Sequence, residues 1–342
     1  MPLSNLRALG RSGLLVSPLT LGTMTFAAQG WGSPDDVSEA VFNAYVDAGG
    51  NSIDTADVYS GGKSEDLTGR YIKARGLRDK VVLATKCGFN GGNSRKNIHR
   101  ALEASLRRLQ TDYIDLYWMH VWDGITPVEE VLQTLSDLTR EGKIRYYGLS
   151  DNPAWYAAKA ATIADLRGLA RPVAMQLAYS LVERNIEHEH IPAAGECGLG
   201  ILPWAPLAAG FLAGKYTQEG EAAKGTGRLM GSSPYGNQFF TDRNWQVLEV
   251  LRTVAEEAGR PMAQVALAWV LSRPGVTSPI VGASRPEQLA DTIAALELAL
   301  SPAQLKALDD GSANAPIFPY SIFTPAIRKG IFGADVEGWD MC

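Results

Sequence analysis

The feature that most limits the fold of this chain is a regular alternation of short apolar runs with longer amphipathic runs. Short runs rich in β-branched and apolar residues are typical of buried strands, and the longer runs have helical spacing. Such alternation favours βαβ units, in which helices connect parallel strands. The predicted strands are Pro18–Gly22, Asn51–Thr55, Val81–Lys86, Tyr113–His120, Ile144–Ser150, Val173–Tyr179, Gly200–Trp204 and Ser278–Gly282.

Seven of these eight strands lead into a helical pattern, directly or after a loop. Those helices are predicted over Asp35–Ala48, Ser64–Arg75, Ser94–Gln110, Pro127–Glu141, Pro153–Leu169, Ile186–Cys197 and Pro286–Leu298. The seventh strand differs, because a long loop over Ala208–Phe240 separates it from two helical runs, Asp242–Ala258 and Pro261–Ser272.

Eight strands with right-handed crossovers can close into a (β/α)8 TIM barrel, an α/β fold of about 250 residues. The 342 residues of the chain suit one such domain with additions. We expect a single domain over 1–342: a small N-terminal hairpin within Leu3–Val16, a barrel core over about 5–310, and a tail over 311–342 near the active-site rim. An open doubly wound sheet is the alternative, but no Gly-x-Gly-x-x-Gly motif follows the first strand.

The amino-acid composition limits the kinds of molecule that the protein is expected to bind. Acidic residues outnumber basic ones, 37 against 32, for a net charge of −5, and no long basic run occurs, which disfavours nucleic acids and anionic membranes. The three cysteines are far apart and lack Cys-x-x-Cys spacing, which predicts reduced thiols and a cytoplasmic location. The uncharged stretch 197–214 contains prolines and glycines, so we expect a buried strand and turn there and no membrane span. His188 and His190 have the wrong spacing for one helix face, so no metal site is expected.

Four reactive side chains are predicted to meet at one rim of the barrel. Asp54 and Tyr59 follow the second strand, Lys86 ends the third, and His120 ends the fourth. Active-site residues of such barrels lie at the carboxyl ends of the strands. Each residue type alone often has only a structural role, but their convergence indicates chemistry.

The combination suits reduction of a carbonyl group. A carbonyl that accepts hydride becomes an alkoxide and needs a proton. A phenol with a pKa near ~10 is a weak acid at neutral pH, but a neighbouring ammonium favours the phenolate and lowers that pKa. A carboxylate keeps the ammonium in place, and an imidazole can donate a hydrogen bond to the carbonyl oxygen.

These motifs resemble the catalytic tetrad of the aldo-keto reductases. The resemblance is carried by Asp54-Thr-Ala-Asp-Val-Tyr59, by Lys86 and by Asp115-Leu-Tyr-Trp-Met-His120. It extends to 21–26, 142–150 and 282–289, and covers residues from about 5 to 300. The nearest branch contains bacterial enzymes similar to potassium-channel β-subunits.

The resemblance implies a barrel that binds NADP(H). Tyr59 would be the proton donor, Lys86 and Asp54 would tune it, and His120 would orient the carbonyl. Arg285 suits a 2′-phosphate, because its planar fork matches that group, so NADPH is expected over NADH. The implied cofactor-binding residues are Gly22, Thr23, Met24, Asp54, Ser150, Asp151, Gln176, Trp204, Ala205, Pro206, Leu207, Gly210, Leu212, Lys215, Arg228, Gly282, Ser284, Arg285, Gln288, Asp291 and Thr292.

The sequence departs from the family pattern at a few of these positions. Asp151 stands where the family usually has Asn, and Asp291 and Thr292 stand where Glu and Asn are common. We expect altered cofactor affinity from these departures.

The substrate is expected to be a small carbonyl compound or alcohol in a pocket walled by Trp31, Trp122 and Tyr179. An aromatic aldehyde, a sugar and a bulky multi-ring ketone all remain open, as do the direction of reaction and the oligomeric state. Two other functions remain as alternatives. One is a Schiff-base lyase using Lys86, and the other is a regulatory partner similar to channel β-subunits.

Overall fold

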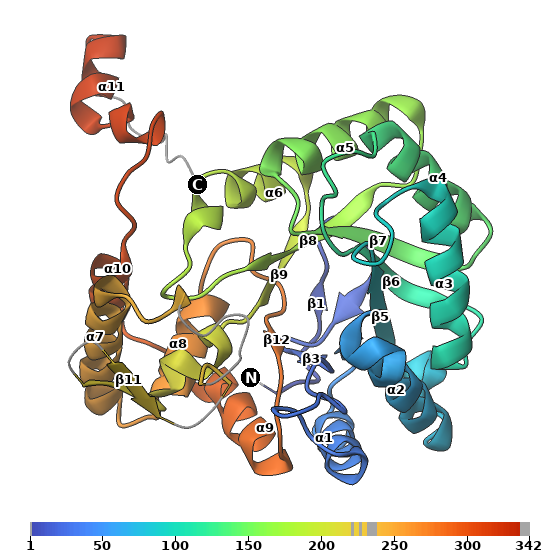
Figure 1. Ribbon diagram of the computed structural model, residues 1–342. Helices are drawn as coiled ribbons and strands as arrows, with labels where there is room; N and C mark the ends of the chain where they lie inside the picture. Colours follow the sequence, from blue (N-terminus) through green and yellow to red (C-terminus); the bar gives the residue numbers. More distant parts are fainter. Residues whose placement is uncertain (1, 220–221, 226–227, 231–237, 336–342) are drawn as a thin grey trace.

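The computed structural model describes residues 2–335, apart from 220–221, 226–227 and 231–237 (Figure 1). Its centre is an eight-stranded parallel sheet in the order β12-β3-β4-β5-β6-β7-β8-β9. The strands are β3 (Thr20–Gly22), β4 (Ser52–Asp54), β5 (Val82–Cys87), β6 (Ile114–Met119), β7 (Ile144–Ser150), β8 (Pro172–Ala178), β9 (Gly200–Trp204) and β12 (Ile280–Val281).

The sheet curls until its two edge strands meet. The amide of Ile201 in β9 donates to the carbonyl of Gly275 (3.1 Å), and Thr277 donates to the carbonyl of Ile201 (2.8 Å), just before β12 begins. The edge strands β9 and β12 are thus joined through these hydrogen bonds, which the edges of an open sheet would lack. The predicted TIM barrel is confirmed.

Helices surround the barrel as the sequence pattern predicts (Figure 1). They are α1 (Asp35–Asp47), α2 (Lys63–Ala74), α3 (Arg95–Leu109), α4 (Val128–Arg140), α5 (Ala154–Arg167), α6 (His190–Cys197), α7 (Asp242–Ala258), α8 (Met262–Leu271), α9 (Pro286–Ile293) and α10 (Pro302–Ser312). The helix predicted over Ile186–Cys197 is wrong at its start. A 3-10 turn over Asn185–Glu187 precedes α6, and the Glu183 side chain accepts from the Asn185 amide (3.1 Å), which favours a turn.

The predicted N-terminal hairpin consists of β1 (Arg7–Ala8) and β2 (Leu15–Val16). Leu9 and Val16, both fully buried, belong to one apolar cluster with Leu116 and Trp118 of the barrel interior, so the hairpin closes the end of the barrel where the strands begin. The Trp118 indole also fills the space beside Gly148, where an added Cβ would lie 2.2 Å from the ring.

The segment after β9 has more structure than the predicted loop. A 3-10 segment, Ala208–Ala213, is followed by an antiparallel hairpin of β10 (Tyr216–Glu219) and β11 (Ala222–Gly225). In the described part of the chain, no helix is long and apolar enough to cross a membrane. The uncharged stretch 197–214 is accounted for by β9 and the 3-10 segment.

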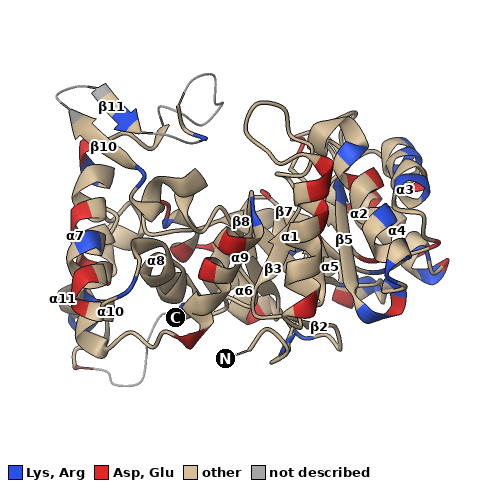
Figure 2. Ribbon diagram, turned by 90° about the horizontal axis from the view of Figure 1, so that it is seen from below, with Lys and Arg blue, Asp and Glu red and all other residues tan. Residues whose placement is uncertain are grey.

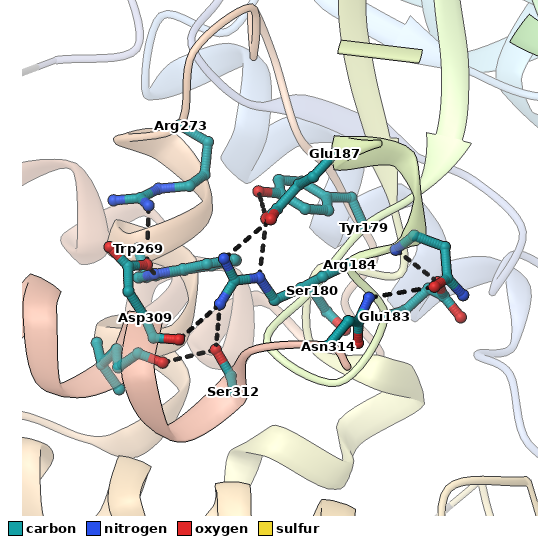
Figure 3. A network of polar contacts seen from close by, with 12 residues as sticks. Tyr179, Ser180, Glu183, Arg184, Glu187, Trp269, Arg273, Asp309, Ser312 and Asn314 are labelled. Carbon is teal, nitrogen blue, oxygen red and sulfur yellow. Dashed lines mark hydrogen bonds and ion pairs between the residues drawn. The ribbon is translucent and has the colours of Figure 1, made fainter. Parts of the chain in front are cut away.

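A polar network ties the end of α10 to the segment after β8 (Figure 3). Arg184 donates to the carbonyl of Asp309 (2.9 Å) and to the Ser312 hydroxyl (2.8 Å), and it pairs with Glu187. The Trp269 indole donates to the Asp309 carboxylate (2.7 Å). Beyond this anchor the chain continues into a 3-10 turn (Tyr320–Ile322), where the Tyr320 ring stacks on His188 with centroids 5.2 Å apart and its hydroxyl donates to Glu189 (3.1 Å). The following helix, α11 (Pro325–Phe332), stands away from the barrel (Figure 1).

Charged residues of both signs are interspersed on the outer helices (Figure 2). Several form ion pairs between neighbouring helices, such as Arg70 with Asp35 and Arg95 with Asp137. Within the described ranges, no group of three or more histidine, cysteine, aspartate or glutamate residues could hold a metal ion.

Candidate active site

The four predicted catalytic residues come from three adjacent strands. Asp54 is the last residue of β4, and Tyr59 begins the 3-10 turn that follows it. Lys86 lies near the end of β5, where it is in register with Trp118 of β6. His120 directly follows β6, and its amide donates to the carbonyl of Cys87 (2.8 Å). The parallel register therefore brings all four side chains to the same end of the barrel.

Lys86 is the centre of the group. Its ammonium, which has no solvent exposure, donates to the Asp54 carboxylate, to the carbonyl of Thr55 (2.8 Å) and to the Tyr59 hydroxyl (3.1 Å). Burial works against the charge, but the attraction of Asp54 and the hydrogen bonds outweigh it and hold the pKa of Lys86 above its ordinary value. The lysine is therefore a permanent cation beside the phenol.

Asp54 is fixed from a second side. The Gln176 side chain in β8 donates to the other carboxylate oxygen of Asp54 (3.0 Å) across the barrel interior. Both side chains are buried. The carboxylate therefore has two fixed donors, which is what a buried charge needs.

His120 is neutral. Burial, together with the positive charge of Lys86, lowers the pKa of His120 to about 2. Its ring lies edge-on to Tyr59, with centroids 5.9 Å apart, and edge-on to Phe89 at 4.6 Å. No hydrogen-bond partner for its buried Nδ1 occurs among the described residues. A neutral imidazole still has one N–H to donate.

Asp54, Tyr59 and His120 line a cavity of about 1160 Å³, and the fully buried Lys86 contacts Asp54 and Tyr59 without lining it. The size suits a large ligand, since sites for small molecules usually measure roughly 300–1,000 Å³. Most of the residues predicted for the site line this cavity, and they are Gly22, Met24, Asp54, Tyr59, His120, Ser150, Asp151, Gln176, Trp204, Ala205, Pro206, Leu207, Gly210, Lys215, Arg228, Gly282, Ser284, Gln288, Thr292 and Trp31.

Four of the predicted cofactor contacts lie outside the cavity wall. Thr23 and Leu212 are buried beneath it, and the Thr23 hydroxyl contacts that of Ser64 (2.8 Å). The Arg285 side chain is largely exposed beside Glu287. Asp291 uses its backbone carbonyl to accept from Gln264 (3.1 Å).

Two of the three predicted substrate-pocket walls also lie elsewhere. Tyr179 is buried against the ring of Trp269, with centroids 5.5 Å apart, and donates its hydroxyl to Glu187 (2.6 Å), as Figure 3 shows. Its polar partner thus lies in the segment before α6 and not in the cavity. Trp122 packs edge-on against Trp155 outside the cavity. Trp31 alone of the three lines the cavity.

Several lining residues were not predicted. Ala27, Ala28 and Gln29 follow β3, and Phe89 and Asn90 follow β5. The usable signal is position, because each comes within a few residues of a catalytic strand end. Ordinary residue types in loops carry no chemical signature of their own.

The cavity has polar groups that fit a dinucleotide. The buried Ser150 hydroxyl lines it and has no protein hydrogen-bond partner within the described ranges, and the Trp204 indole donates to Asp151 (3.0 Å). Later in the chain, the cations Lys215 and Arg228 also line the cavity, and cationic side chains suit phosphate groups.

The backbone between Trp204 and Lys215 has unusual conformations. Positive φ angles occur at Ala205 (49°), Ala208 (48°), Ala209 (55°) and Gly210 (95°). Alanine rarely adopts this conformation, and such strain concentrates where a chain wraps a ligand. Ala205, Ala209 and Gly210 line the cavity, and Ala208 is buried.

Comparison with known proteins agrees with this geometry. The model of the aldo/keto reductase family matches residues 18–312. This protein belongs to that family. It is an oxidoreductase, and the family typically uses a nicotinamide cofactor with a small carbonyl substrate.

Three relatives span most of the chain. An oxidoreductase of Bacillus subtilis named YrpG is 38% identical over 88% of this chain and 94% of its own. The aryl-alcohol dehydrogenase [NADP(+)] of Phanerodontia chrysosporium is 35% identical over 91% and 86%. A probable voltage-gated potassium channel subunit beta of Oryza sativa subsp. japonica is 36% identical over 85% and 90%. The expected branch of the family is thereby confirmed.

Proposed function

We propose that this protein is an NADPH-dependent carbonyl reductase that converts aldehydes or ketones to alcohols reversibly. The observation that carries the proposal is the buried Lys86 ammonium, which joins the Asp54 carboxylate to the Tyr59 hydroxyl beside a neutral His120. This is the arrangement that protonation of a nascent alkoxide requires.

Each residue has a distinct part in the reaction. NADPH, when bound, supplies the hydride. Tyr59 donates its hydroxyl proton to the substrate oxygen, and the adjacent Lys86 ammonium stabilises the phenolate that remains. Asp54 holds Lys86 in position, and His120 donates a hydrogen bond that directs the carbonyl oxygen toward Tyr59. In the reverse direction the phenolate accepts the proton of the alcohol.

The assignment of NADPH rests on charge and on a relative. Lys215 and Arg228 line the cavity, and Arg285 precedes α9 next to Ser284. The name of the Phanerodontia relative specifies NADP(+). We assign Trp204 to the nicotinamide ring, Ser150 and Gln176 to its carboxamide, and the basic side chains to the phosphates.

An aromatic aldehyde or aryl ketone is the substrate class that the walls favour. Trp31 and Phe89 give the cavity two aromatic side chains beside Tyr59 and His120. Aromatic rings pack well against such walls, and the name of the same relative specifies an aryl alcohol.

Replacement of Tyr59 by Phe tests the proposal. The variant should bind NADPH as the wild type does, measured by quenching of tryptophan fluorescence, and should lose at least about 10²-fold in turnover of benzaldehyde. Tyr320→Phe is the control, because Tyr320 lies in the tail outside the cavity lining and its hydroxyl donates to Glu189, just before α6. Equal turnover in Tyr59→Phe would refute the assignment. Cofactor binding with negligible wild-type turnover of a broad aldehyde panel would favour the regulatory alternative.

A further inference from the structure

Two large aromatic side chains stand exposed next to the catalytic cavity. Trp122 is 38% exposed and Trp155 is 55% exposed. Their rings pack edge to face, with centroids 5.7 Å apart at an interplanar angle of 88°. Indole rings are usually much more buried than this, and an exposed aromatic cluster on a soluble protein often marks a binding surface.

The topology places this pair at the mouth of the site. His120 and Asp151 line the cavity. Trp122 comes two residues after His120, and Trp155 comes four residues after Asp151. The Trp122 amide donates to the carbonyl of Asp151 (3.3 Å), so the two loops touch. The loops that carry the tryptophan pair are therefore joined to the catalytic rim.

The pair lies toward the substrate end of that rim. The loops after β3, β4, β5 and β6 supply the groups assigned to the substrate, whereas the groups assigned to the cofactor lie mainly at β7, β8, β9 and β12. Trp122 belongs to the loop after β6, directly beside the loop that contains Phe89.

The loop that carries Trp122 is held firmly. Asn93 donates its side-chain amide to the carbonyl of Val121 (2.7 Å), and the Asp123 carboxylate accepts from the Asn93 amide (2.8 Å). Asp123 also accepts from the Thr126 amide (2.9 Å) and hydroxyl (2.7 Å). The loops after β5 and β6 are thus joined, and Phe89 and Trp122 keep a fixed relation. A preorganised aromatic surface binds with little loss of entropy.

We propose that Trp122 and Trp155 form a shelf that binds the distal ring of an extended, planar aromatic carbonyl substrate while its carbonyl group reaches Tyr59. The inference rests on the proposed function and specifies its substrate class as multi-ring aryl aldehydes or ketones. A second protein copy is a poorer occupant. Two partly exposed indoles offer on the order of 200 Å², against about 800 Å² per partner in a stable interface.

The test compares substrates of increasing ring number. Benzaldehyde, 2-naphthaldehyde and 2-anthraldehyde are assayed with the wild type, Trp122→Ala, Trp155→Ala and the double variant. In the wild type KM should fall as rings are added. In the double variant KM for 2-anthraldehyde should rise about three- to tenfold, the range expected for loss of an aromatic contact, while KM for benzaldehyde changes less than twofold.

Two further variants control the comparison. Phe318→Ala removes an 80% exposed aromatic side chain from the tail and should leave all three KM values unchanged. Trp155→Phe retains a ring and should keep most of the preference for the larger aldehydes. Circular dichroism of every variant establishes that the fold is retained.

Binding of the corresponding alcohols separates the shelf from the proposed reaction. Dissociation constants of benzyl, naphthyl and anthryl alcohols are measured by fluorescence quenching in the presence of NADP⁺, so the result does not depend on turnover. If the dissociation constants depend on the number of rings in the same way in the double variant and the wild type, the proposed shelf is wrong. If the double variant has a different oligomeric state by sedimentation while the dependence on ring number is unchanged, the two tryptophans belong to a subunit interface and the proposed shelf is also wrong. Absence of aldehyde turnover by the wild type would instead count against the proposed function.

Discussion

Asp151 gives the sharpest prediction about pH and stability. Its carboxylate is largely buried at the cavity wall, and burial raises its pKa from 3.8 to about 6, although the hydrogen bond from Trp204 and the charge of Lys86 oppose the shift. Its φ of 47° lies in the left-handed region that asparagine also tolerates. Asp151→Asn should therefore keep the backbone and the bond from Trp204 while removing the charge.

The magnitude follows from linkage. A shift of about two pKa units corresponds to about 3 kcal/mol at 1.36 kcal/mol per unit. Because Asp151 faces the cavity and is partly solvated, we expect about 1–2 kcal/mol. Below pH 3.8 the carboxyl is protonated in both states and costs nothing. As pH rises from 3.8 to 6, the carboxyl ionises in the unfolded state but stays protonated in the folded state. The free energy of unfolding of the wild type therefore falls by about 1–2 kcal/mol over this range and stays lower at higher pH.

Urea denaturation at pH 4, 6 and 8 measures this effect. Asp151→Asn should be more stable than the wild type by about 1–2 kcal/mol at pH 8, with the difference shrinking toward zero at pH 4. Asp123→Asn is a control of opposite sign. Hydrogen bonds from Thr126, Ile125 and Asn93 overcome the effect of burial and lower the pKa of Asp123 to about 2, so this variant should be destabilised above pH 4. A difference for Asp151→Asn that is independent of pH would refute the reasoning.

The remaining predictions concern the tetrad and the barrel interior. Lys86→Met should abolish turnover and destabilise the protein by about 3–5 kcal/mol, because Asp54 loses its buried cation; denaturation of this variant and of the double variant with Asp54→Asn should show partial recovery in the latter. His120→Ala should lower kcat/KM by a constant factor between pH 5 and 8, because the pKa of His120 near 2 lies outside that range; an acid limb removed by the substitution would contradict this. Gly148→Ala should destabilise the barrel by about 1–3 kcal/mol in urea, since its Cβ would lie 2.2 Å from the Trp118 ring.

The barrel, and the meeting of Asp54, Tyr59, Lys86 and His120 at one end of it, were predictable because they depend on periodic or local signals. The eight strands follow from alternation of apolar and amphipathic runs, and Asp54, Lys86 and His120 are located once the strand ends are known. The hairpin of β10 and β11 was not predictable, since its residues have no strong alternation.

The roles of individual aromatic residues were harder to predict for a different reason. Tyr179 follows β8 and Trp122 follows β6, yet Tyr179 contacts Glu187 and Trp269, and Trp122 contacts Trp155. Which way a side chain turns at a strand end is decided by long-range packing. One-dimensional spacing contains no information about such partners.

Gln176 joins the cavity wall to the hydrogen-bonded group of Asp54, Lys86 and Tyr59. The sequence resemblance implies a carboxamide ligand, but in the structure its side-chain nitrogen donates to Asp54 (3.0 Å) while the residue also lines the cavity. An amide has one oxygen and two N–H groups, so Gln176 can hold Asp54 and still offer its oxygen to a ligand. A ligand that engages this oxygen therefore fixes the same side chain that positions Asp54, and through Asp54 it fixes Lys86 and Tyr59. In the proposed function, where Gln176 binds the nicotinamide carboxamide, cofactor binding and proton transfer therefore depend on one connected set of hydrogen bonds.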